Sequence, residues 1–224
     1  MLAFIEQLGH GQTHAQGLMF LGAGASVRRD LATYAERVGE LRRVAVRYGL
    51  PAYVVFADAF ITFATDSPAS RQAMQDAASL VRDGFGFKAV TIGTMVIRRA
   101  ELEIAAGDAR AARATVEESL EWIRAQGEHF FESEALRVRA EAERALGDDP
   151  GAQASYRAAI EVARGQGARL FELRATRGLA RLWQGQGRSA DARRVLEPLY
   201  ESMTEGRDCV DLREAAALHA DLGP

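Results

Sequence analysis

Residues Leu179 to Leu199 read LARLWQGQGRSADARRVLEPL, and the interpretation of this stretch decides the fold. Gly185, Gly187 and Ala190 fit the G-x-G-x-x-G/A pattern of a dinucleotide-binding loop, which requires a β-strand directly before it. The same residues also fit a tight turn between two helices, because glycine readily ends a helix. The organisation of the whole chain separates these two interpretations.

Apolar residues recur at helical spacing through nearly all of the 224 residues, and no segment shows sustained strand alternation. Glycines repeat in two interleaved sets, each with a step of about 40 residues. The first set is Gly9, Gly49, Gly86, Gly127, Gly167 and Gly206, and the second is Gly107, Gly147 and Gly187. This step predicts repeated pairs of antiparallel helices that are joined by glycine turns.

Small residues keep the same step. They are Ala100, Ala140 and Ala180 in the first helix of each predicted pair, and Ala112, Ala152 and Ala192 in the second. A small side chain at these places lets paired helices approach closely. Because Gly187 then lies at the turn position that Gly107 and Gly147 occupy, and because no strand precedes it, the sequence favours a helix turn over a phosphate-binding loop.

The opening stretch is similar to the tetratricopeptide (TPR) repeat pattern. It supplies the pair Leu179-Ala180, the aromatic Trp183, the turn residue Gly187 and the small Ala192. The step of about 40 residues, against 34 in the standard repeat, implies helices longer than usual.

A wider stretch, Gly165 to Leu222, resembles the C-terminal TPR region of large bacterial signalling proteins. The matching elements are QGARLFELRA, LARLWQGQGR and the ending Y…TEG…DL.EA..L. In that family, an adenylate/guanylate cyclase domain or a transcriptional-regulator domain precedes an AAA+-type ATPase domain and the repeats. The resemblance implies that this chain is the repeat region without the catalytic part. The start LAFIEQLGH resembles the end of a second helix, so we expect a fragment of a longer protein.

We therefore predict an all-α fold, a TPR-like α-solenoid. It is a right-handed superhelix of antiparallel helix pairs that forms a single repeat domain over residues 1–224 and ends in a capping helix. The predicted boundaries are 1–10 for the end of a truncated repeat, then 11–49, 50–86, 87–127, 128–167 and 168–206 for helix pairs, and 207–224 for the capping helix.

Cap chemistry marks several predicted helix starts. Asp108 follows Gly107, and Asp149-Pro150 and Ser67-Pro68 each place an oxygen-bearing cap before a proline. A D-x-x-E box, Asp211 and Glu214, is expected to cap the last helix. The aromatic residues Trp122, Trp183, Phe130, Phe131 and Phe171 lie on apolar helical stripes and are expected in the core between helices.

Charge and cysteine content restrict the partners and the compartment. The net charge of −3 provides no basic field for nucleic acid or anionic lipid. The single cysteine, Cys209, forms no internal disulfide, which suits a reducing cytoplasm. The start carries no secretory signal pattern, and the longest apolar stretch contains Asp58 and is too short to span a bilayer. We expect a cytoplasmic protein without nucleic-acid or membrane partners.

Candidate metal and catalytic residues are sparse. His10 and His14 have the i, i+4 spacing that places two imidazoles on one helix face, but a zinc site needs three or four ligands. Asp148 and Asp149 are adjacent carboxylates, which turn and cap roles explain more simply than acid–base catalysis. The sequence therefore predicts no metal, no cofactor and no enzymatic activity.

The candidate binding surface is the face that the first helices of successive pairs would line. Its predicted polar side chains are Glu101, Glu134, Arg137, Glu141, Arg144, Arg174, Arg177 and Arg181. One hypothesis is a cleft whose arginines bind an acidic peptide or a terminal carboxylate. The alternative, which we favour, is that Glu134 pairs with Arg174 and Glu141 with Arg181, because residues 40 apart are lateral neighbours.

The leading functional prediction is a non-enzymatic protein-interaction or regulatory-sensor module, part of a larger bacterial signalling protein of the cyclase or transcriptional-regulator type. The alternative is a sensor domain that binds a small ligand inside the superhelix. Self-association is also expected, because a solenoid cut at its N-terminal end exposes an apolar face that a second copy could cover.

Overall fold

A computed structural model of the chain describes residues 9–62 and 88–223, and all regular elements within these ranges are helices. The predicted all-α class is confirmed for this part of the chain. The elements are α2 (Gly11–Val27), α3 (Leu31–Arg47), α4 (Pro51–Thr62), α6 (Lys88–Ala105), α7 (Ala109–Gln126), the short 3-10 helix η1 (His129–Phe131), α8 (Glu132–Ala145), α9 (Asp149–Gly165), α10 (Arg169–Gly185), α11 (Ser189–Glu201) and α12 (Val210–Asp221).

The chain divides into two compact units, Met1–Arg98 and Arg99–Pro224. In the first unit, α3 packs against both α2 and α4. Tyr34, which is 1% exposed, donates a hydrogen bond of 2.7 Å from its hydroxyl to the carbonyl of Phe60. The two rings also meet edge to face, with centroids 6.3 Å apart. This contact joins α3 to the end of α4.

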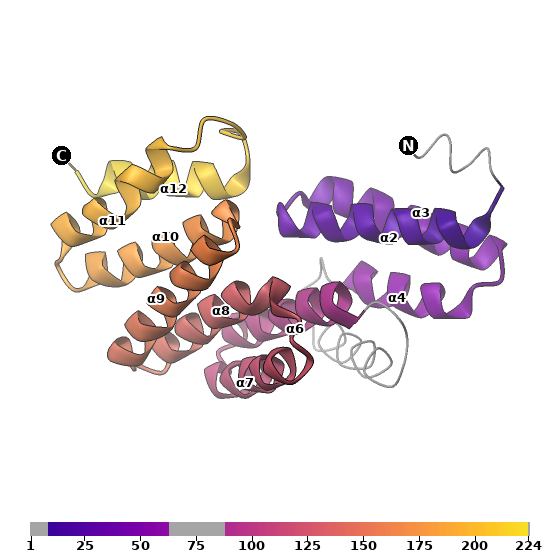
Figure 1. Ribbon diagram of the computed structural model, residues 1–224, viewed down its shortest axis with the longest axis horizontal. Coiled ribbons are helices and arrows are strands. Elements are labelled where there is room, and N and C mark those ends of the chain that lie inside the picture. The colour runs from indigo at the N-terminus through magenta and orange to yellow at the C-terminus, as the bar shows by residue number, and fades with distance from the viewer. Residues whose placement is uncertain (1–8, 63–87, 224) are drawn as a thin grey trace. The chain divides into compact units, whose positions relative to one another are not determined.

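In the second unit, consecutive helices pack against each other from α7 through α11, and α12 packs on both α10 and α11. Figure 1 shows the chain turning back on itself at each connection from α8 to α11. α8 also contacts α10, so the first helices of two successive pairs lie side by side. The helix bounds follow the predicted pairs, while the superhelix, its handedness and the TPR likeness remain predictions.

The predicted boundary glycines that the structure describes all have left-handed backbone, with φ from +62° to +82°. They are Gly9, Gly49, Gly107, Gly127, Gly147, Gly167, Gly187 and Gly206. Gly86 lies outside the described residues, as do Ser67 and Pro68.

The opening stretch is a helix–turn–helix. Gly185 is the last residue of α10, Gly187 has φ of +75° in the turn, and Ala190 lies in the first turn of α11. The element before the glycines is therefore a helix, where a dinucleotide-binding loop would need a strand. The turn interpretation is confirmed.

The two glycines of this turn should respond oppositely to alanine. Gly187→Ala is expected to destabilise the chain by about 1–2 kcal/mol, because a Cβ disfavours left-handed backbone. Gly185→Ala should instead stabilise it by about 0.5 kcal/mol, because alanine is the better helix former and its Cβ would meet no atom within 4 Å. Urea unfolding followed by circular dichroism measures both values. Equal effects at the two positions would contradict this assignment of the turn.

All six alanines that keep the 40-residue step are fully buried, at 0% exposure. They are Ala100, Ala112, Ala140, Ala152, Ala180 and Ala192. This burial agrees with the predicted packing role, because any larger side chain would have to displace the neighbouring helix.

A buried hydrogen bond within a helix pair keeps the same step, although the sequence analysis did not identify it. In one pair the Thr115 hydroxyl donates to the Glu103 carboxylate at 2.8 Å, and in the next the Ser155 hydroxyl donates to Glu143 at 2.6 Å. Both acceptors lie in first helices and both donors in second helices. The following pair has Trp183 at the position of these glutamates. The repeat is therefore visible in polar contacts as well as in packing.

Two cap predictions need correction. α9 begins at Asp149, and its cap is Asp148, whose carboxylate accepts a hydrogen bond of 3.0 Å from the backbone of Gly151. α12 begins at Val210 after Cys209, without a side-chain cap hydrogen bond, so the predicted D-x-x-E box at Asp211 and Glu214 lies inside the helix. The predicted cap at Asp108 is confirmed, with a hydrogen bond of 3.0 Å from Ala111.

The aromatic predictions hold for some residues only. Phe131, Phe171 and Trp183 are buried, at 4%, 5% and 8% exposure. Phe130, in contrast, is 57% exposed, so its assignment to the core is wrong. It belongs to η1, and its ring lies against the outside of the buried pair, with centroids 4.8 Å from Phe131 and 6.4 Å from Phe171.

Candidate functional site

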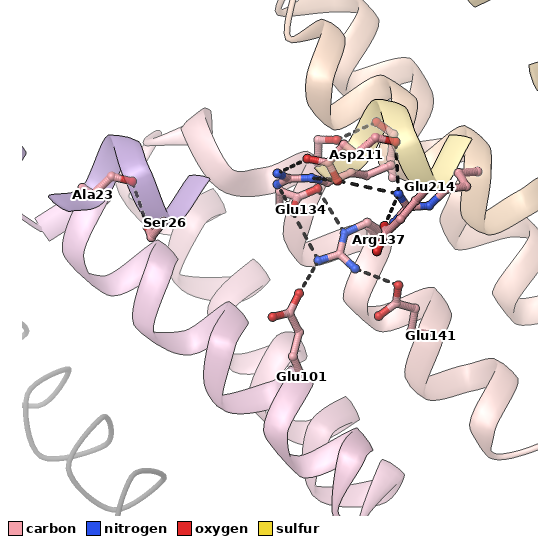
Figure 2. Close-up of polar contacts among 12 residues, drawn as sticks. Ala23, Ser26, Glu101, Glu134, Arg137, Glu141, Asp211 and Glu214 are labelled. Atoms are coloured by element: carbon pink, nitrogen blue, oxygen red, sulfur yellow. Dashed lines mark hydrogen bonds and ion pairs between the residues drawn. The ribbon is translucent and has the colours of Figure 1, made fainter. Parts of the chain in front are cut away.

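The structure gathers acidic and basic side chains from α6, α8, α10 and α12 into one hydrogen-bonded group, which we call the charge cluster (Figure 2). Its members are Glu101, Glu134, Arg137, Glu141, Arg174, Arg177, Asp211 and Glu214. Three of them, at positions 134, 174 and 214, follow one another at the 40-residue repeat step. The cluster thus extends across successive first helices.

Arg137 connects α8 to α6. Its guanidinium donates to Glu134 at 3.1 Å and to Glu141 at 2.7 Å, both on its own helix, where residues three and four apart are neighbours. It also donates to Glu101 of α6 at 2.7 Å. The Arg137 side chain is only 8% exposed, so these ion pairs are largely shielded from water.

Arg174 connects α10 to α8 and α12. It donates through Nε and Nη2 to the two carboxylate oxygens of Asp211, at 3.0 and 2.7 Å, which is the forked geometry that guanidinium favours. Its Nη1 donates to Glu134 at 3.1 Å. The side chain of Asp211 is 0% exposed and that of Glu134 is 5% exposed. Arg174 therefore lies between two buried carboxylates.

Arg177 lies one turn further along α10 and forms an ion pair with Glu214 of α12. Its guanidinium is also 3.7 Å from the carboxylate of Asp211. Figure 2 shows Asp211 and Glu214 approaching the arginines from the same helix. α12 is thus attached to α10 through two carboxylates.

The pKa values follow from burial and from these contacts. Burial by itself raises the pKa of the Glu134 carboxyl, but the charges of Arg137 and Arg174 and their hydrogen bonds outweigh it, so this pKa lies below its ordinary value. Burial likewise lowers the pKa of Arg137, and the surrounding carboxylates reverse the shift and raise it. Both groups are therefore charged at neutral pH although both are buried.

We expect the free energy of unfolding to decrease as the pH falls below 4.5, the ordinary pKa of glutamate. Because the pKa of Glu134 is lower in the folded chain than in the unfolded chain, the unfolded chain binds more protons. The contribution of Glu134 is then fully present above 4.5 and is lost as the pH falls through the folded-state pKa. Urea unfolding in a pH series measures it. Glu134→Gln should show a shallower decrease, and an identical decrease in both chains would contradict the assignment.

The eight predicted surface residues divide into two groups. Six of them belong to the charge cluster: Glu101, Glu134, Arg137, Glu141, Arg174 and Arg177. The other two, Arg144 and Arg181, are exposed and lie one turn beyond the cluster on α8 and α10. Arg144 also hydrogen-bonds the hydroxyl of Tyr156, a ring whose burial raises its pKa.

The two predicted ion pairs have different outcomes. The pair of Glu134 and Arg174 is confirmed at 3.1 Å. The pair of Glu141 and Arg181 is wrong, because Glu141 accepts its hydrogen bond from Arg137, while Arg181 is exposed. The reason is distance along the helix, since Arg137 is one turn from Glu141 and needs no second helix to reach it.

Asp211 and Glu214 are the cluster members that the sequence analysis missed, because it assigned them to a helix cap. Two signals could have identified them. Glu214 lies 40 residues after Arg174, as Arg174 does after Glu134, and Asp211 is an acidic residue at a repeat position that Phe171 occupies one step earlier. An acidic residue at an apolar position indicates a buried ion pair.

The histidines have local roles. His10 is the cap of α2, and its Nδ1 accepts a hydrogen bond of 3.3 Å from the backbone of Thr13. His14 is buried and its Nε2 is 3.8 Å from the carboxylate of Glu40. Over residues 9–62 and 88–223, no group of three or more histidine, cysteine, aspartate or glutamate side chains is placed to hold a metal ion.

No helix among the described residues is both long and apolar enough to cross a membrane. No protein-family model matches the chain, and no curated protein sequence matches it. The relation to the TPR regions of bacterial cyclases and transcriptional regulators therefore stays a prediction from the residues of 165–222.

Proposed function

We propose that this chain is a non-enzymatic protein-interaction module, and that its partner binds along the first helices of the second unit, α8 and α10. The observation that carries the proposal is the charge cluster, which fixes these two helices to each other and to α12 through buried ion pairs. A binding surface on such helices is organised before the partner arrives, so little conformational entropy is lost on binding.

The exposed continuation of the cluster is where contact is expected. Arg144 lies seven residues after Arg137, and Arg181 seven residues after Arg174, so each shares a helix face with a cluster arginine. Because Arg137 and Arg174 already bind carboxylates of this chain, the exposed Arg144 and Arg181 are the better candidates for contact with another protein. The proposed partner therefore carries acidic residues.

The test is capture of a partner from a lysate of the source bacterium by the whole chain. Arg144→Glu with Arg181→Glu should abolish capture of the protein that the unchanged chain retains, since opposite charges would then become like charges. The matched control is Arg110→Glu with Arg113→Glu, the same charge change at exposed positions of the second helix α7. Equal loss in both variants, or loss in neither, would reject this surface.

A small-ligand sensor is the competing function, and one measurement separates the two. A panel of metabolites should leave the melting temperature unchanged if the chain binds only proteins, whereas a metabolite that binds the folded chain raises it. The assignment to a cytoplasmic bacterial signalling protein is part of the proposal and rests on the sequence resemblance alone.

A further inference from the structure

α12 is attached to α10 by an arrangement of charges that is independent of its own helix start. Asp211 and Glu214 are three residues apart and so share one face of α12. Asp211 is fully buried against Arg174, and Glu214 pairs with Arg177. The two arginines are also three residues apart, on α10. Two carboxylates of one helix thus match two guanidinium groups of another.

α12 is also a separate element of the chain. A non-helical segment, residues 202–209, connects it to α11, and residues 204–208 of that segment are exposed. Eight residues span at most about 27 Å when extended, so the connection permits α12 to leave its place without unfolding α11. The apolar side chains that hold it, Leu212, Leu218 and Leu222, are few.

The buried arginine sets the chemistry of any replacement for α12. Arg174 is 7% exposed, and a buried guanidinium that loses a carboxylate partner is strongly destabilising. A purely apolar helix would leave it without Asp211, whereas a helix with two carboxylates at the same spacing would restore both pairs. The site therefore discriminates by charge and by spacing.

We infer that Arg174 and Arg177 form a receptor for an acidic helix, that α12 occupies this receptor within the chain, and that the partner binds by presenting a helix with carboxylates three residues apart in its place. This inference rests on the proposed function, whose partner class it names. A longer partner helix would also reach Arg181, which lies one turn beyond Arg177 on α10 and is exposed. That third contact would favour the partner over α12.

The experiment uses the full chain, cut once at a protease site placed in residues 204–208, so that α12 is present but not covalently held. The probe is a fluorescent peptide of residues 209–223. It should replace α12 and give a saturable rise in anisotropy. A peptide with Asp211→Asn and Glu214→Gln should bind at least ten-fold more weakly, since it lacks both carboxylates. The matched control, Asp221→Asn, removes an exposed carboxylate and should bind like the unchanged peptide.

A second probe tests the partner chemistry without the α12 sequence. An alanine-based helical peptide with carboxylate pairs three residues apart should compete with the labelled peptide. The same composition with pairs two residues apart should not compete, because those side chains face different directions. Equal binding of the acidic and amide peptides, or no exchange at all, would overturn the inference.

Two further measurements keep the outcome decisive. If the cut chain loses its helical circular dichroism, the uncut Glu214→Gln chain replaces it and should bind the peptide more tightly than the unchanged chain does; equal affinity would overturn the inference. Light scattering that gives twice 24.4 kDa, with no peptide uptake, would assign the receptor to a second copy and also overturn it. Peptide exchange needs no natural partner, so failure of the lysate capture and failure of this inference are distinguishable.

Discussion

Arg174→Ala is expected to lower the free energy of unfolding by about 3–5 kcal/mol, the usual cost of removing one partner of a buried ion pair. The alanine leaves the fully buried Asp211 without its forked hydrogen bonds and takes one cation from Glu134. Urea unfolding followed by circular dichroism measures the change at neutral pH. A decrease below about 1 kcal/mol would mean that the cluster is solvated and contributes little.

Two variants serve as controls for this result. Arg181→Ala, seven residues further along the same helix and exposed, should change stability by less than about 0.5 kcal/mol. Arg174→Met combined with Asp211→Leu should recover most of the loss, because apolar side chains can replace a buried ion pair without penalty. Glu134 keeps Arg137 as its partner in that double variant.

Trp183→Ala is expected to cost about 3–5 kcal/mol, as large-to-small changes at buried aromatic positions do. Trp183 is 8% exposed, and its indole donates a hydrogen bond of 2.6 Å to Gln153 of α9. The guanidinium groups of Arg188 and Arg157 lie over its ring, 4.6 and 5.8 Å from the centroid. Removing the indole leaves a cavity between α9 and α10 and ends all of these contacts.

Trp183→Phe separates packing from hydrogen bonding. It keeps an aromatic ring and should cost only about 1–2 kcal/mol, for one lost hydrogen bond and some lost contact area. Because Trp183 is itself a fluorophore, circular dichroism is the appropriate measurement for both variants. Equal losses in the alanine and phenylalanine chains would show that the hydrogen bond to Gln153, and not the ring, carries the stability.

The groove prediction shows how far sequence reasoning reached at the site. Counting helix faces from the repeat selected six residues that do belong to the charge cluster, and it identified the pair of Glu134 and Arg174. It did not identify Asp211, because the cap rule for acidic residues near a helix start competed with the repeat register. That rule fails here because α12 starts one residue earlier, which turns Asp211 toward Arg174.

The sequence alone determined the helical class, the helix pairs and the turns between them. These features are local, since left-handed glycines end helices wherever they occur and small alanines fit only where helices touch. Tertiary structure decided which carboxylate each arginine binds. Five carboxylates share three guanidinium groups in the cluster, and which of them meet depends on which helix faces come into contact. Ion pairs follow distance in space, so a change of one residue in a helix start changes the partner.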